Sequence, residues 1–185
     1  IGAPGLYGKR LELINETIPV ISLVGILLNP NNPTANTVLE ETKGVAKELG
    51  VQIRSLEVRS LADIDIAFET AIKARVGALV VAQQAPIQSN QKRFVELAAK
   101  RRLPAIYADT PWIHDGGLIS YGPSIADVHR RAADYVDKIL KGRPPSDLPV
   151  QQPVKYDLMI NLKTAKALGL LIPPVVLMRA EKVVK

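Results

Sequence analysis

The sequence predicts an α/β fold in which a parallel, doubly wound sheet carries helices on both faces. Three observations lead to this prediction. Short apolar segments alternate along the chain with amphipathic segments of helical period, which is the order of βαβ units. Most of the apolar segments lack the alternation of a strand with one wet face, as expected where helices cover both faces. Hydrophobic residues make up 47% of the chain, which favours a packed core over disorder.

The helices and strands up to residue 107 are predicted from the hydrophobic periodicity and from residues that end or cap helices. Gly50 ends the second helix, and Ser60 with Asp63 three positions later forms a weak capping box for the third. Right-handed crossovers then connect the parallel strands. The predicted order is a helix over residues 9–16, a strand over 23–28, a helix over 34–49, a strand over 51–58, a helix over 60–75, a strand over 78–82, a helix over 87–102 and a strand over 105–107.

The remaining segments do not continue this simple pattern. A strand holds Ser120 and Tyr121, and Ser124 is expected to cap a long helix that ends at Leu140. The apolar positions of that helix have the spacing of a buried stripe: Ile125, Val128, Ala132, Tyr135, Val136 and Ile139. A proline-rich linker over 143–149 leads to an extended segment over 150–153, a strand over 156–160, a helix over 162–168 and a last helix after Pro173 and Pro174.

We therefore divide the chain into three parts. Residues 1–122 form the α/β domain, and residues 123–148 form a crossover helix with its linker. Residues 149–185 form a return segment that packs on the α/β domain.

Composition excludes several classes of function. The net charge is +6, but the basic clusters at 100–102 and 129–131 are short and lack aromatic neighbours, so we expect solvated faces and no nucleic-acid partner. The absence of cysteine excludes disulfides and thiol catalysis. No apolar run reaches the ~18 residues of a membrane helix. Neither a signal peptide nor an initiator methionine begins the sequence, so we expect a mature or truncated product.

Motifs for chemistry on a substrate are missing from the sequence. It contains no GxGxxG, no GxxxxGK[ST] and no GxSxG, and its two histidines lie 15 residues apart without metal-site spacing. His114 beside Asp115 could serve acid–base chemistry, but a surface histidine next to a turn-forming aspartate is favoured. We therefore expect no catalytic residues, no metal and no cofactor.

Polar and aromatic side chains follow successive strands of the predicted sheet. Because the carboxyl ends of parallel strands share one edge, these side chains should converge on a crevice. The predicted ligand-binding residues are Asn29, Gln83, Gln84, Tyr107, Asp109, Trp112 and Tyr121. In this prediction Asp109 pairs with a cationic group, Tyr107 and Trp112 stack on the ligand, and Asn29 and Gln84 form hydrogen bonds. The alternative is that Trp112 caps a core and Asp109 starts a turn.

Several segments of the chain resemble a known family. The pieces GKRLELINETIP, LLNPNNPTA, RLPAIYAD, GGLISYGPS and above all INLKTAKALGLLIPP are similar to the solute-binding components of bacterial ABC importers, in the family that includes aromatic amino-acid binders. The resemblance implies a type I periplasmic binding protein, with two α/β lobes that close on a ligand. This chain matches the second lobe and the carboxyl-terminal crossings, so the first lobe and its leader are expected to be missing. Where family members commonly have Asp-Pro after the third strand, this sequence has Ala85-Pro86, and the loop from Thr110 to His114 also differs.

The resemblance predicts a function without catalysis. We expect the solute-binding component of an importer, which captures a small polar, amino-acid-like ligand in the periplasm or, in an organism with a single membrane, as an exported and lipid-anchored protein. Its partners would be the ligand and the permease subunits, so that it meets the membrane only through the permease. We also expect self-association through residues 124–140, because the stripe on that helix lacks a partner if the first lobe is missing. The alternatives are a sensory domain of the same fold that signals through a partner protein, and a flavodoxin-like enzyme.

Overall fold

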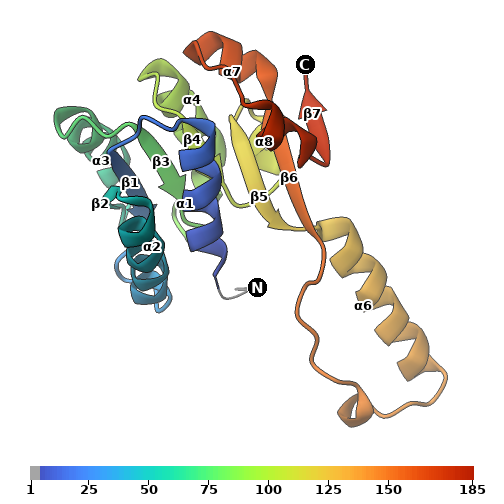
Figure 1. Cartoon of the computed structure of the whole chain (residues 1–185). Helices are drawn as coiled ribbons and strands as arrows, with labels where there is room; N and C mark the ends of the chain where they lie inside the picture. The colour runs from blue at the N-terminus through green and yellow to red at the C-terminus, as the bar shows by residue number, and fades with distance from the viewer. Residues whose placement is uncertain (1–4) are drawn as a thin grey trace.

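The computed structural model describes residues 5–185 of the chain as an α/β body from which one helix projects (Figure 1). Short 3₁₀ turns at Gln88–Asn90 and Pro145–Asp147 interrupt the connections. The helices and strands follow in the order α1 (Leu6–Thr17), β1 (Leu23–Leu28), α2 (Ala35–Leu49), β2 (Gln52–Glu57), α3 (Asp63–Lys73), β3 (Ala78–Val81), α4 (Gln91–Lys100), β4 (Ala105–Tyr107), α5 (Pro111–His114), β5 (Ile119–Pro123), α6 (Ile125–Leu140), β6 (Tyr156–Asn161), α7 (Leu162–Leu168), α8 (Pro174–Met178) and β7 (Lys182–Val184).

The strands form one sheet in the order β2-β1-β3-β4-β5-β6-β7. Strands β1 to β5 pair in parallel, as the sequence predicts for a doubly wound sheet. Strand β6 runs antiparallel to β5, with Gly122 opposite Asp157, and β7 pairs in parallel with β6. The return segment thus adds two strands to the sheet, of which β7 was not predicted and β6 makes the sheet mixed.

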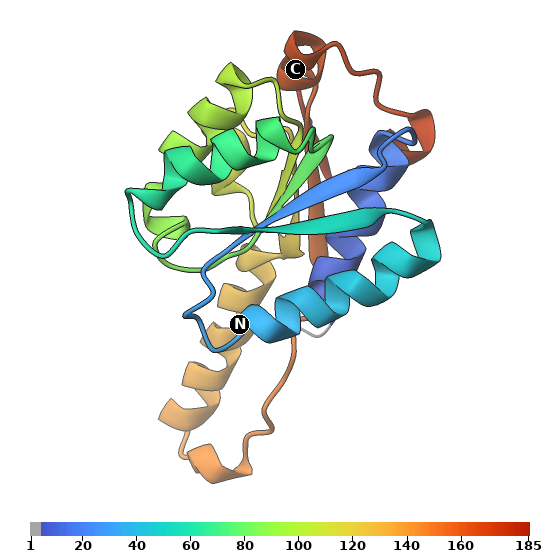
Figure 2. The same cartoon turned by 90° about the vertical axis from the view of Figure 1, so that its left-hand side faces the viewer.

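Two cores lie on the two faces of the sheet, and Figure 2 shows the sheet between its helix layers. On one face α1 and α2 cover strand residues such as Val24 and Ile106. On the other face α3 and α4 contribute Phe68 and Phe94, whose rings lie 6.0 Å apart. Because the central strands are buried on both faces, their sequences are continuously apolar.

Element boundaries differ from the sequence prediction mainly around the loops. The helix expected over 87–102 begins as a 3₁₀ turn and becomes α-helical only at Gln91. The loop after β4 contains a one-turn helix, α5, which begins at Pro111, where the fixed φ of proline suits the first helical position. Such a short helix has no period that the sequence could reveal.

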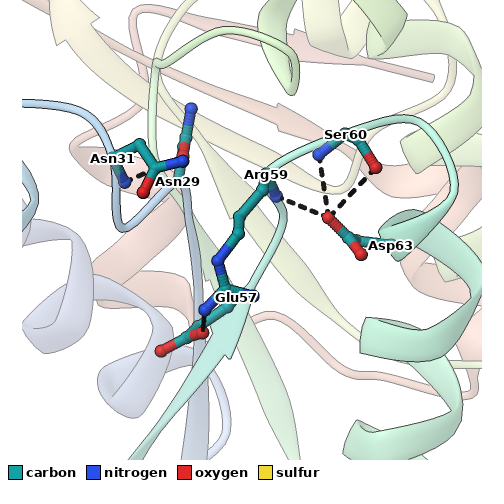
Figure 3. Close-up of polar contacts among 6 residues, drawn as sticks. All are labelled: Asn29, Asn31, Glu57, Arg59, Ser60 and Asp63. Carbon is teal, nitrogen blue, oxygen red and sulfur yellow. Dashed lines mark hydrogen bonds and ion pairs between the residues drawn. The ribbon is translucent and has the colours of Figure 1, made fainter.

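Polar contacts order the loops at the carboxyl ends of β1 and β2 (Figure 3). The side-chain oxygen of Asn29 accepts a hydrogen bond from the Asn31 backbone N–H at 3.0 Å, which fixes the turn after β1. The Asp63 carboxylate accepts the backbone N–H groups of Arg59 and Ser60 at 2.9 and 2.8 Å. The hydrogen bond from the Ser60 backbone is the largest of the effects that lower the pKa of Asp63. It is also the half of the predicted capping box in which the acidic side chain accepts the backbone N–H of the serine.

Helix α6 extends away from the body together with the segment that returns to β6 (Figure 1). None of its residues is buried in the structure, and Ile125 and Leu140 are 46% and 81% exposed. Between α6 and residues 145–153 lies a largely apolar groove of about 390 Å³, lined by Val128, Tyr135 and Ile139 among others. The Tyr135 hydroxyl donates to the Pro149 carbonyl at 2.6 Å and connects the two sides of the groove.

Candidate functional site

The carboxyl edge of β1 and β3 is held together by the side chain of Gln84. Its carbonyl oxygen accepts the Asn29 backbone N–H at 2.9 Å, and its amide donates to the Thr34 hydroxyl at 2.9 Å. The Asn29 amide donates in turn to the Ala85 carbonyl at 2.8 Å. Gln84 is buried and has both ends of its amide occupied, so it supports the edge from within, whereas Asn29 is only half-buried.

Gln83 and Asp109 connect the ends of β3 and β4. The exposed Gln83 side chain donates from its amide to Asp109 Oδ2 at 2.8 Å. Asp109 Oδ1 is buried and has no hydrogen-bond partner among residues 5–185. Burial raises the pKa of Asp109 and the positive charge of Arg10 opposes that rise. An unsatisfied carboxylate oxygen at this edge is an acceptor ready for a donor.

Tyr107 and Trp112 lie in the core instead of at the open edge. They are 2% and 1% exposed, and their rings stack at 4.7 Å between centroids with planes 16° apart. Burial also raises the pKa of Tyr107. Since each ring already covers a face of the other, the structure places neither where it can stack on a ligand. This corrects our expectation for both residues and matches the alternative in which Trp112 fills the core.

Tyr121 lies on β5 at the same edge and remains half-buried. Its ring stacks on that of Tyr156 from β6 at 5.8 Å between centroids. Burial raises the pKa of Tyr121 while Lys9 lowers it. Of the predicted site residues, Asn29, Gln83, Asp109 and Tyr121 lie at this edge without being fully buried.

Arg10 on α1 is a residue of this edge that sequence reasoning missed. Its Nε donates to the Tyr121 carbonyl at 2.9 Å and its Nη2 to the Ala108 carbonyl at 3.5 Å. The sequence does hold a signal, because position 10 shares the helical spacing i, i+3, i+4, i+7 with Leu13, Ile14 and Thr17, which are all buried. A charged residue inside an apolar stripe needs a polar partner, and such a residue is a candidate for function.

The edge offers groups that suit the binding of a small ligand. Within residues 5–185, no three or more His, Asp or Glu side chains gather in a way that could hold a metal ion. His114 and Asp115 are both exposed, and Asp115 accepts a hydrogen bond from Gln91 at 2.7 Å. Amides, a carboxylate and a guanidinium suit a small ligand with charged and hydrogen-bonding groups.

Comparison with known proteins shows which family and structures the chain resembles. The family model described as "ABC transporter substrate binding protein" matches residues 5–184. A structure of an ABC domain from Streptococcus pneumoniae in complex with L-Trp has a TM-score of 0.83 and 27% identity, over 97% of this chain and 62% of that one. A conserved domain protein from Vibrio cholerae has a TM-score of 0.83 and 27% identity, over 96% and 60%.

A curated relative is named for binding another aromatic amino acid. The "Tyrosine-binding protein" of Clostridioides difficile is 20% identical over 162 residues, which are 88% of this chain and 47% of that protein. The chain spans about half the length of the curated relatives it matches. No helix formed by residues 5–185 has both the length and the apolar character needed to cross a membrane.

Proposed function

Since this chain belongs to the family of ABC transporter substrate-binding proteins, we propose that it captures a small amino-acid-like solute for a bacterial importer. The family is one of binding proteins and is not an enzyme family. The observation that carries the proposal is the buried, unsatisfied Oδ1 of Asp109, which lies at the carboxyl edge of the sheet. In open α/β sheets this edge is where ligands bind.

The proposed ligand is an amino acid, with aromatic ones as first candidates. Similarity to an L-Trp complex and to a tyrosine-binding protein supports this class. In the proposed site Asp109 accepts the ligand ammonium, while Asn29 and Gln83 supply hydrogen bonds. Tyr121 replaces Tyr107 and Trp112 as the aromatic surface, because its ring lies at the edge.

The proposed setting follows from the family. We place the protein in the periplasm, or on the outer surface of a cell with a single membrane, where it delivers its ligand to the permease subunits. The α/β domain of residues 1–122, with the return segment of residues 149–185 packed on it, would form one wall of the ligand site, and residues 123–148 would form the crossover toward the other wall. The similar structures extend beyond the region that matches this chain. We therefore propose that further residues, beyond the matched region, complete the enclosure of the ligand.

Calorimetry with a matched pair of variants tests the proposal. Titration of the chain with each common amino acid should identify a ligand, and L-tryptophan and L-tyrosine are expected to bind. Asp109→Ala should then weaken binding by about 2 kcal/mol, the lower end of the range for a truncated charge pair, because Asp109 is only half-buried. Asp115→Ala removes an equal charge from an exposed position and should leave the affinity unchanged. Equal affinities of the two variants would remove Asp109 from the site.

We also propose that the chain self-associates through residues 124–140. Several positions of the α6 stripe remain exposed, with Ile125 at 46%, Val136 at 56% and Ile139 at 40%, and monomers rarely leave such a stripe uncovered. A two-fold dimer would bury the stripes of two copies against each other. Sedimentation of the wild type and of a Val128→Asp, Tyr135→Asp variant tests this, and a wild type that stays monomeric at high micromolar concentration would contradict it.

A further inference from the structure

Arg10 carries a buried positive charge that its protein contacts do not neutralise. It is 2% exposed, and its two hydrogen bonds go to backbone carbonyls, of which the one to Ala108 is long at 3.5 Å. Its guanidinium carbon lies 4.8 Å from the centroid of the Tyr7 ring. Burial lowers the pKa of Arg10, although arginine stays protonated in proteins. Dipoles and a ring face compensate such a charge only in part, so a full negative charge nearby would stabilise it.

Asp109 and Glu41 supply negative charge near Arg10, and the effect of Asp109 is the larger. Arg10 and Asp109 act on each other through space, since each shifts the pKa of the other, but no ion pair joins them. Asp109 Oδ2 is held by Gln83, and Oδ1 has no partner among residues 5–185. On Arg10, Nε and Nη2 donate to backbone carbonyls, and the Tyr7 side chain also interacts with the guanidinium. A carboxylate and a guanidinium of opposite charge thus lie near each other, and the carboxylate has one unpaired oxygen.

We propose that Arg10 and Asp109 together recognise the zwitterionic end of an α-amino acid. Asp109 Oδ1 accepts a proton of the ligand ammonium, and the Arg10 guanidinium donates to the ligand carboxylate. An α-amino acid carries these two charges on one carbon, so it completes both protein groups when it lies between them. The inference rests on the proposed function for the class of ligand and adds Arg10 as the residue that selects for a carboxylate.

The ends of two strands explain why Arg10 and Asp109 lie near each other. Arg10 is fixed by carbonyls at the ends of β4 and β5, and Asp109 follows β4 by two residues. Gly122 on β5 lets the backbones of the two strand ends approach closely, since a Cβ built there would lie 1.9 Å from the Ala108 carbonyl oxygen and 3.7 Å from Nη2 of Arg10. Helix α1 and the two strand ends therefore place the Arg10 guanidinium and the Asp109 carboxylate near each other at this edge.

Ligand analogues distinguish this inference from simpler ones. Tryptamine lacks the carboxylate of L-tryptophan, and indole-3-propionate lacks its ammonium. Binding of all three to the ¹⁵N-labelled chain can be measured from amide shift changes in NMR spectra. L-Tryptophan should bind about tenfold or more tightly than either analogue, because each analogue leaves one charged group of the protein unpaired.

Variants then assign each charge to its residue. Arg10→Gln should weaken L-tryptophan binding about tenfold and leave tryptamine within about twofold of wild type. Asp109→Asn should weaken L-tryptophan in the same way and leave indole-3-propionate within about twofold. Arg10→Lys, which keeps the charge, should recover part of the preference for L-tryptophan over tryptamine. Arg101→Gln is the control, because Arg101 follows α4 at the opposite edge of the sheet.

Three results would overturn the inference. If L-tryptophan and tryptamine bind the wild type equally, the site does not recognise a carboxylate, although the proposed function would stand. If Arg10→Gln weakens the binding of tryptamine as much as that of L-tryptophan, Arg10 acts only by supporting the fold. Unchanged tryptamine binding is for that reason also the folding control for this variant. If neither L-tryptophan nor any other amino acid shifts an amide signal, the proposed function fails and the inference fails with it.

Discussion

Replacing Gly122 by alanine should destabilise the protein and disturb the candidate site together. A Cβ at this position would lie 1.9 Å from the Ala108 carbonyl oxygen, whereas ordinary contacts begin at 3.4 Å, so the ends of β4 and β5 must separate by about 1.5 Å. The obstacle is backbone, which cannot rotate away as a side chain would. We expect a loss of about 3 kcal/mol in the free energy of unfolding, at the upper end of the usual range for overpacking. The same separation would move the Ala108 and Tyr121 carbonyls that hold Arg10.

Urea unfolding followed by tryptophan fluorescence measures this loss. Trp112 is the only tryptophan and is buried, so its emission reports on the core. Gly44→Ala is the matched control, because Gly44 lies inside α2 with no atom within 4 Å of an added Cβ. That change should stabilise the protein by about 0.5–1 kcal/mol, the difference in helix propensity. A Gly122→Ala protein within about 0.5 kcal/mol of wild type would refute the reasoning from the contact with Ala108.

Three further predictions follow from burial and charge. Trp112→Leu should lower the free energy of unfolding by about 3 kcal/mol, because the stacking on Tyr107 and much buried surface are lost. Urea unfolding followed by circular dichroism measures this loss, and a value below about 1 kcal/mol would contradict the core position of Trp112. The pKa of Asp63 is lowered in the folded state, so the ionised carboxylate stabilises the fold above its unfolded pKa of about 3.9, and this stabilisation is lost as the pH falls through the folded pKa. The difference in Tm between wild type and Asp63→Asn should therefore shrink at acid pH. A difference that does not depend on pH would argue against this. The pKa of Asp109 is raised, which reverses the sign: its ionisation costs stability as pH rises through the folded pKa. Asp109→Asn should thus be more stable than wild type at pH 7 but not below about pH 4, and urea unfolding at both pH values would reveal the opposite order if the burial argument fails.

Part of the candidate site could be predicted because it follows from topology. Asn29, Gln83 and Asp109 come directly after β1, β3 and β4, and parallel strands bring such positions to one edge. Which of the neighbouring side chains face outward could not be predicted. Tyr107 and Asp109 are two positions apart on one strand end, yet the first packs in the core and the second reaches the edge.

The alternation of strands and helices, and the edge at which polar groups gather, can be predicted from the sequence because the hydrophobic period of each segment is a local property. Three features come instead from the packing of distant elements: Trp112 fills the core, β6 reverses direction beside β5, and Arg10 reaches the Tyr121 carbonyl 111 positions later in the chain. These outcomes depend on which surfaces of distant elements pack together, and periodicity reports that a residue is buried without naming the partner against which it is buried. For this reason neither local sequence reveals that the charge of Arg10 lies near the unpaired oxygen of Asp109.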